Sequence, residues 1–330
     1  MKAIIAANTG AVLTEVPTPA PKAKEVLIQV KANSLNRADL MMLQGADHGG
    51  WGGGAGKILG LEWAGDVVEV GADVKEYHVG DRVMSAGPQA FAEYTIGNPI
   101  AMNLIPDGMS YEEAACLPVA LQTMHDAIST LGGLTIGQTI LFQGASSAMG
   151  LIGMQAAKYL GAGKVIGTSR SAERCAKLME YGCDAAVDTS NPAWEEEVLK
   201  ETDGVGVDLL IDFLSGPIMN KNLQVTRIGG RIVNVGRSAG ETGEFNFDLH
   251  NMRRITYIGA SFRTRTLAET AEVILRTKNA FGQALKEGNF KMPIDKTYPM
   301  EEAAEAFKRM IENKHFGKIV LNVYKRGADL

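Results

Sequence analysis

The stretch that decides the fold is ILFQGASSAMGLIGMQAAKYLGA, residues 140–162. An apolar run ends at Phe142, a turn of small residues follows from Gly144 to Gly150, and apolar positions then recur at helical spacing. A strand, a tight glycine turn and a helix open a dinucleotide-binding unit, because the helix N-terminus offers unpaired N–H groups to a pyrophosphate. The match to G-x-G-x-x-G is partial, since Ser147 and Ala148 fill its middle. An ordinary buried strand–turn–helix would give the same pattern, so the surrounding sequence has to decide.

Strands and helices alternate from residue 139 onward. The expected strands are 139–143, 164–168, 185–188, 207–212, 231–235 and 255–259. The expected helices are 150–160, 171–181, 192–201, 217–227 and 248–253. This alternation predicts a doubly wound parallel sheet with right-handed crossovers, and six strands are what a full dinucleotide fold requires. The sequence therefore favours a cofactor turn at residues 144–150.

Composition limits the classes of protein to consider. The chain has 330 residues, 45% hydrophobic and 22% charged, with a formal net charge of −5. These values predict about two globular domains and no nucleic-acid partner, because nucleic-acid binding needs a basic face. Cys116, Cys175 and Cys183 form no C-x-x-C pair, which argues against a disulfide framework or a cysteine zinc site. We expect no signal peptide, no membrane span and a cytoplasmic location.

The two ends of the chain are expected to form one β-rich domain. Short β-branched runs separated by turn signals predict strands at 2–6, 13–16, 26–32, 65–70 and 82–84. Residues 111–116 and 121–131 have helical patterns. The final segment predicts helices at about 266–287 and 301–313 and a strand at 318–323. Because this segment is short for a separate domain, we expect it to complete the N-terminal one.

The glycine-rich stretch GADHGGWGGGAG, residues 45–56, has two open interpretations. It is either a mobile lid over a site, with Trp51 covering a ligand, or a disordered surface loop.

The end of the second strand of the predicted sheet indicates which nicotinamide cofactor fits. An NAD site needs an acid there, to bond the adenosine ribose hydroxyls. The segment instead reads Ile166-Gly-Thr-Ser-Arg170, followed by Ser171, Glu173 and Arg174. Arg170 and Arg174 are four residues apart, close enough to bind one phosphate, which favours NADPH. Two solvated arginines remain the alternative, and Glu173 either weakens the site or faces solvent.

Metal catalysis is the competing chemistry. A catalytic zinc needs about three converging protein ligands. His48, His78, His125, His250 and His315 lie in five unrelated segments, and Asp39 and Glu62 alone do not make a site. We therefore predict no metal.

The chain resembles the zinc-independent, zeta-crystallin-like NADPH:quinone oxidoreductases of the medium-chain dehydrogenase/reductase family. The resemblance is carried by SLNRADLMMLQG, ILGLEWAGDVVEVG, VGDRV, GASSAMG, GTSRSAER, GGRIVNVG, GASFRTRT and HFGKIVL, in this order. The family's zinc enzymes carry Gly-His-Glu where this chain has Gly60-Leu61-Glu62, a cysteine within Asn36–Asp39, and a four-cysteine lobe that is missing here. The departures agree with the prediction of no zinc.

The resemblance implies an α/β architecture. A GroES-like β-rich catalytic domain, residues 1–117 and 262–330, would carry an inserted Rossmann doubly wound parallel sheet, residues 118–261. The cofactor would lie in the cleft. The family often dimerises through the Rossmann sheet edge, so we expect a homodimer that uses the strand at residues 255–259.

The resemblance also implies the contacts of NADPH. Asn36 would lie near the nicotinamide ribose, Thr123 beside the ring and Arg174 at the 2′-phosphate. The full expected set is Asn36, Thr123, Gly144, Ser146, Ser147, Ala148, Met149, Gly150, Ser169, Arg170, Arg174, Val235, Gly236, Arg237, Ser261, Phe262 and His315. Relatives often place a tyrosine near the glycine-rich loop, where this chain has Asp47, His48 and Trp51, so no proton donor is assigned.

The expected mechanism is hydride transfer from NADPH to an electron-poor carbon of a small-molecule substrate, a quinone, enone or ketone. The oxyanion that forms needs a donor, which the amide of Asn36 or Gln122 could supply. Asp39 either positions Asn36 or Arg37 or serves only the fold, and the proton could come from solvent. Three functions stay open: a quinone reductase, an enoyl or carbonyl reductase, and a non-catalytic NADPH-binding protein.

Overall fold

The computed structural model describes residues 1–8, 10–46, 49 and 52–323. The chain folds into two compact units. Unit 1 is made of Met1–Val119, Phe262–Gly288 and Met292–Leu330, and unit 2 of Ala120–Ser261 with Asn289–Lys291. The domain bounds expected from the sequence, residues 1–117 with 262–330 and residues 118–261, stay a proposal. No helix in the described part of the chain has both the length and the apolar composition to cross a membrane.

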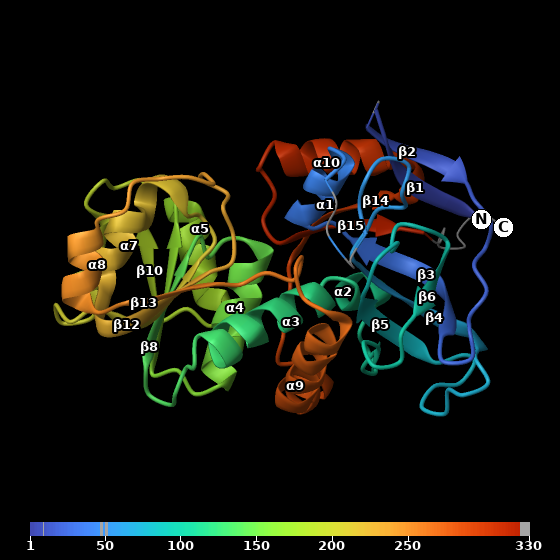
Figure 1. Cartoon of the computed structure of the whole chain (residues 1–330), viewed down its shortest axis with the longest axis horizontal. Helices are drawn as coiled ribbons and strands as arrows, with labels where there is room; N and C mark the ends of the chain where they lie inside the picture. Colours follow the sequence, from blue (N-terminus) through green and yellow to red (C-terminus); the bar gives the residue numbers. More distant parts are fainter. Residues whose placement is uncertain (9, 47–48, 50–51, 324–330) are drawn as a thin grey trace. The chain divides into compact units, whose positions relative to one another are not determined.

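Unit 2 is built on a six-stranded parallel sheet (Figure 1). Its strands are β8 (Thr139–Gln143), β9 (Lys164–Ser169), β10 (Ala185–Asp188), β11 (Val207–Asp212), β12 (Thr226–Asn234) and β13 (Thr256–Gly259). Their spatial order is β10-β9-β8-β11-β12-β13, so the order reverses between β8 and β11. Ligands of such sheets bind at that reversal, outside the carboxyl ends of the strands. The predicted doubly wound sheet is confirmed.

The helices of unit 2 cover both faces of this sheet because its strands are apolar on both sides. They are α3 (Pro118–His125, shared with unit 1), α4 (Ala148–Tyr159), α5 (Ala172–Leu178), α6 (Trp194–Glu201), α7 (Met219–Val225) and α8 (Phe247–Arg253). Leu141 of β8 packs in one core cluster with Val198 of α6 and Leu223 of α7. The next residue, Phe142, points to the other face, where it contacts Gly153 of α4.

Unit 1 contains an antiparallel hairpin and a seven-stranded sheet. The hairpin is β1 (Lys2–Ala7) with β2 (Gly10–Glu15). The sheet strands are β3 (Val26–Ser34), β4 (Glu62–Val70), β5 (Arg82–Ala86), β6 (Tyr94–Gly97), β7 (Asn103–Leu104), β14 (Ile294–Pro299) and β15 (Lys318–Asn322). Their order is β14-β15-β3-β4-β5-β7, with β6 also pairing β3. The C-terminal strands therefore join the N-terminal sheet, as predicted.

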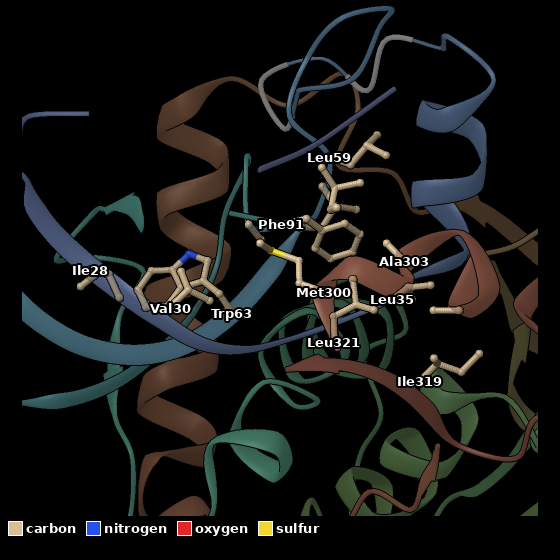
Figure 2. Close-up of a cluster of buried hydrophobic side chains, with 14 of the residues drawn as sticks. Ile28, Val30, Leu35, Leu59, Trp63, Phe91, Met300, Ala303, Ile319 and Leu321 are labelled. Carbon is tan, nitrogen blue, oxygen red and sulfur yellow. The ribbon is translucent and has the colours of Figure 1, made fainter. Parts of the chain in front are cut away.

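A cluster of buried hydrophobic side chains packs the sheet and α10 (Ala303–Ile311) of unit 1, and Figure 2 shows part of it. Trp63 of β4, Phe91 and Leu321 of β15 are each at most 1% exposed. The unit also contains α1 (Arg37–Leu43), α2 (Tyr111–Ala114) and α9 (Leu267–Lys286). Helix α10 buries Ala303, Ala306, Phe307 and Met310, the spacing of a helix with one apolar face. Phe307 meets Phe91 edge to face, with ring centroids 6.2 Å apart.

Several elements differ from the sequence-based expectation. Strands β6, β7 and β14 were not predicted, because they are short and have no sustained apolar alternation. The expected strand at 231–235 is β12, which begins five residues earlier, at Thr226, beyond a register shift against β11. The expected helix at 121–131 divides into α3 and a π-helix, η2 (Asp126–Leu131). A change from i+4 to i+5 bonding leaves little trace in apolar periodicity.

Candidate functional site

The small-residue turn of unit 2 has the geometry of an anion-binding loop. Gly144 follows β8 with φ +86°, a conformation that favours glycine, and its N–H donates to Thr168 Oγ1 at 2.9 Å. Ser147 is the N-cap of α4, and its Oγ accepts from the Gly150 N–H at 3.2 Å. The turn is thus followed directly by a 12-residue helix. Its first backbone N–H groups and the positive end of its dipole can bind a phosphate.

Gly150 lets the start of α4 lie directly on this turn. A Cβ at Gly150 would stand 2.5 Å from the Ala145 Cα, a backbone atom that cannot move aside cheaply. Gly150 is therefore required for close helix–turn packing, the role of a fingerprint glycine. Ser146, Ala148 and Met149 lie between these points, so the predicted residues of the turn form one continuous segment.

The end of β9 lies beside the turn. Ser169 is buried, and its Oγ donates to Ser146 Oγ at 3.3 Å. Arg170 is exposed and precedes Ser171, the N-cap of α5, so the helical i,i+4 spacing assumed for the two arginines does not apply. Arg174 is the third residue of α5, in its first turn.

The structure shows what surrounds Glu173. Its carboxylate binds Lys177 Nζ at 2.7 Å, one helical turn farther along α5, and its side chain is 77% exposed. Glu173 therefore faces solvent, but its charge also acts on Arg174, so both sequence interpretations stay open.

The loops after β11 and β12 are bonded to each other at the same carboxyl edge of the sheet. Ser238 Oγ donates to the Phe213 carbonyl at 2.6 Å, and Ser215 Oγ donates to the Gly236 carbonyl at 2.9 Å. Val235, Gly236 and Arg237 follow β12, and Ser261 follows β13 with Phe262 next to it. The structure thus brings the predicted residues of unit 2 to the strand ends, at the edge where the glycine turn lies, while Phe262 begins the next segment of unit 1.

Sequence reasoning missed the residue that holds these loops. Asp212 is fully buried at the end of β11, and its Oδ1 accepts from the N–H groups of Leu214 at 2.9 Å and Ser215 at 3.0 Å. Burial raises the pKa of Asp212, and these two N–H donors oppose the rise. An acid that ends an otherwise apolar strand was the available signal.

Unit 1 contains a buried polar cluster of four side chains from three neighbouring strands. Glu62 is the first residue of β4, Lys318 the first of β15, and Ser34 the last of β3. Asn36 follows β3 as the N-cap of α1. All four are at most 6% exposed, in a setting where ionised groups are found only when paired. We had considered Asn36 and Glu62 from the sequence, but not Lys318.

Asp39 lies next to this cluster, in the first turn of α1. Its Oδ2 accepts from the Asn36 N–H at 2.6 Å, and the backbone N–H of Gly60 also acts on the carboxylate. Burial raises the pKa of Asp39 to about 7. The Asn36 N–H and the Lys318 charge act in the opposite direction, while the Glu62 charge adds to the rise. The Asn36–Asp39 bond belongs to the capping box of α1, so it fits both roles considered for Asp39, helix capping and positioning of Asn36.

The remaining predicted residues fall in separate places. Gln122 and Thr123 lie on α3 in unit 2, and His315 lies between α10 and β15 in unit 1. Asp47, His48 and Trp51 lie outside the described residues, so the lid interpretation stays a prediction.

The described residues show no arrangement that fits a catalytic zinc. Within the described ranges, no group of three or more His, Cys, Asp or Glu side chains is arranged to hold a metal ion. Leu61 offers no ligand atom, and the carboxylate of Glu62 binds the ammonium of Lys318 at 2.5 Å. A protein cation already occupies the place next to the acid.

Two family descriptions match the chain. Residues 22–122 match "Alcohol dehydrogenase GroES-like domain", and residues 148–276 match "Zinc-binding dehydrogenase". Quinone oxidoreductase-like protein 2 of Bos taurus is 29% identical over 93% of this chain and 87% of that protein. Mycocerosic acid synthase-like polyketide synthase of Mycolicibacterium smegmatis is 27% identical over 94% of this chain, which spans only 14% of the synthase.

Solved structures agree with the fold. An alcohol dehydrogenase superfamily protein from Novosphingobium aromaticivorans superposes with a TM-score of 0.85 over 98% of this chain and 100% of that one, at 25% identity. A quinone oxidoreductase of Pseudomonas syringae gives a TM-score of 0.84 over 97% of this chain and 99% of that one, at 24% identity. With a GroES-like domain, a Rossmann-like sheet and these matches, the chain belongs to the medium-chain dehydrogenase/reductase family of NAD(P)-dependent oxidoreductases.

Proposed function

We propose that the chain is a metal-independent reductase that uses NADPH to reduce a quinone or a similar electron-poor carbonyl compound. The observation that carries the proposal is the buried Lys318–Glu62 pair beside the Asn36 amide. A lysine ammonium and a side-chain amide stand at the segment where the resemblance would put a metal and its ligands. The site therefore offers a developing oxyanion a hydrogen-bond donor in the place of a metal.

The cofactor assignment rests on unit 2. The N-terminus of α4 and the Gly144–Gly150 turn would hold the pyrophosphate, with Ser147 at the helix cap. No acid ends β9, and Arg170 and Arg174 flank Ser171 there, so a 2′-phosphate would meet two cations. Glu173 is paired with Lys177, and its charge also acts on Arg174, so a phosphate would share Arg174 with this acid. When bound, NADPH supplies the hydride.

The remaining chemistry belongs to the protein. Asn36 donates to the substrate oxygen that gains negative charge, which stabilises the transition state more than the ground state. Asp39 holds the Asn36 backbone, so the donor is preorganised. The proton that completes reduction comes from solvent.

A second substrate class has its own support. The chain aligns over 94% of its length with a segment of the mycobacterial synthase, and the CurK enoyl reductase superposes with a TM-score of 0.84. An enoyl thioester and an enone place negative charge on a carbonyl oxygen, as a quinone does, so the same donor serves both. A non-catalytic NADPH-binding protein remains the third candidate.

We also propose a cytoplasmic homodimer that joins through β13. This strand is at the edge of its sheet, and Tyr257 on it is 44% exposed. An unpaired edge strand is a template for pairing with a second copy.

The phosphate assignment can be tested by substituting the two arginines. Loss of one charge-assisted bond costs about 1.5–3 kcal/mol, so Arg174→Ala should weaken NADPH binding about 10- to 100-fold and leave NADH nearly unchanged. Arg170→Ala should act in the same direction, and Arg276→Ala on α9 is the control. Affinities come from titration of cofactor fluorescence. Equal losses for NADPH and NADH would remove the assignment.

A further inference from the structure

The polar cluster of unit 1 is a product of strand order. β15, β3 and β4 are consecutive in the sheet, and the register sets Val320 opposite Ser34 and Ala32 opposite Ala64. Lys318 and Glu62 stand at the first residues of their strands and reach the segment that follows β3. Lys318 is 2% exposed and Glu62 fully buried, so their contacts are made without competing water.

Every donor of Lys318 is used. Its Nζ donates to the Leu35 carbonyl at 3.2 Å, to Asn36 Oδ1 at 2.7 Å and to Glu62 Oε1 at 2.5 Å. Because an ammonium has three N–H groups, none is left for a substrate. The lysine can therefore influence chemistry only through its neighbours.

Glu62 is equally occupied. Its Oε1 accepts from Ser34 Oγ at 2.6 Å and Asn36 Nδ2 at 2.8 Å as well as from Lys318, and its Oε2 accepts from the Val119 N–H at 2.9 Å. The carboxylate has no room for a further ligand in this arrangement.

The pair fixes which way the Asn36 amide points. Its Oδ1 faces the ammonium and its Nδ2 faces the carboxylate. A half-turn of the amide would set Oδ1 against the carboxylate and the NH₂ group against the ammonium, replacing two charge-assisted bonds with two repulsions. One N–H of the NH₂ group is bound to Glu62, and no acceptor is found for the other among the described residues.

We propose that Lys318 and Glu62 are positioning residues that lock the Asn36 amide in one orientation and so keep its second Nδ2 N–H available to the oxygen of the hydride acceptor. The inference rests on the proposed function, in which Asn36 is the oxyanion donor. Lys318 also draws electron density from the amide through Oδ1, which strengthens the N–H as a donor. A metal would contact the substrate oxygen directly, whereas the Lys318 ammonium acts on it through the Asn36 amide.

The simpler explanation is a structural brace between strands. Single substitutions would not separate the two, because an unpaired buried charge destabilises the fold. Lys318→Met with Glu62→Gln removes both charges. The single glutamine oxygen can keep the bond from the Val119 N–H, and its NH₂ group can donate to Ser34 Oγ, which then accepts instead of donating. Opposite a neutral amide and a methionine, both orientations of Asn36 become comparable. The control is Lys31→Met with Asp66→Asn, a partly buried pair at 3.4 Å that also joins β3 and β4.

Two readouts test the proposal. The first is kcat, measured with Asn36→Ala as a reference and with all three substitutions combined. The second is the ionisation of 4-nitrophenol bound in the presence of NADP⁺, followed by its absorbance. Bound phenolate stands for the oxyanion, so a donor lowers the pKa of the bound phenol whether or not the protein turns over substrate.

The expected result is a fall in kcat of about tenfold or more for the double variant, within the ~100- to 1000-fold cost of deleting an oxyanion donor. The KM for NADPH and the folded state should not change, and the double substitution should add nothing in the Asn36→Ala background. The pKa of bound 4-nitrophenol should rise in the double and Asn36→Ala variants and not in the control.

Two results would overturn the inference. One is wild-type kcat and wild-type phenol ionisation in the double variant, and the other is an equal loss of kcat with and without Asn36. If the unsubstituted protein reduces no acceptor, the proposed function fails by itself. The phenol titration then decides the inference alone, and identical ionisation in all variants contradicts it.

Discussion

Substituting Gly150 by alanine tests the contact that shapes the cofactor turn. The new Cβ would lie 2.5 Å from the Ala145 Cα, so α4 has to move away from the turn. Overpacking of this kind costs about 1–3 kcal/mol, against the roughly 0.5–1 kcal/mol that alanine gains over glycine within a helix. We expect a net destabilisation of about 1–2 kcal/mol. Because the helix N-terminus moves with α4, NADPH affinity should fall about tenfold or more.

Gly282→Ala is the matched control, because Gly282 lies within α9 and a Cβ there would meet nothing within 4 Å. It should raise the free energy of unfolding by about 0.5–1 kcal/mol and leave cofactor affinity unchanged. Urea denaturation gives the stabilities, and cofactor fluorescence gives the affinities. If Gly150→Ala matches the control in both, the close-packing argument is wrong.

Three further predictions concern other parts of the molecule. Burial raises the pKa of Asp39 from its usual value of 3.8 to about 7 in the folded chain. Between these pH values the folded state binds more protons than the unfolded state. The free energy of unfolding should therefore fall as pH rises from about 4 to 7, by up to about 4 kcal/mol. Asp39→Asn should lack this decline in urea denaturation followed across pH, and parallel curves for the two proteins would contradict the assignment. Ile258→Lys places a charge on β13 and should convert the proposed dimer to a monomer, whereas the control Leu275→Lys on α9 should leave it a dimer. Analytical ultracentrifugation gives the oligomeric state. A dimer in both variants would exclude the edge-strand interface. Burial raises the pKa of all three thiols, Cys116, Cys175 and Cys183, and that of Cys183 to about 11. At pH 8, iodoacetamide should therefore label the thiols of the native protein far more slowly than those of the denatured protein. Rapid labelling of the native protein, measured by mass spectrometry, would refute this.

Most elements of the fold could be predicted from local sequence patterns. The apolar run, small-residue turn and helix at residues 140–162 are contiguous, and each strand and helix of unit 2 repeats one periodicity over a short window. The single hand of crossovers between parallel strands restricts the possible sheet orders but does not fix one. The same local pattern indicated that Ser147 places a hydroxyl in the turn. In the structure Ser147 is the N-cap of α4.

The buried lysine–glutamate pair was beyond that kind of reasoning. Lys318 and Glu62 are 256 positions apart, and only the strand order β15-β3-β4 brings them together. The one sequence signal was a charged residue of each sign at the edge of an apolar run, in LEWAG and in GKIVL. Arg170 shows the converse error: its spacing from Arg174 suggested one helical face, but Ser171 caps α5 and leaves Arg170 outside the helix.

The central claim is hydride transfer from NADPH to an electron-poor carbonyl compound without a metal. The most direct measurement follows NADPH oxidation by the chelator-treated protein with a panel of quinones, enones and ketones, and repeats it with NADH and with added zinc. We predict turnover of at least one quinone or enone, a higher kcat/KM with NADPH than with NADH, and no effect of chelator or zinc. Tight NADPH binding without turnover of any acceptor, or activity that chelation removes and zinc restores, would contradict the account.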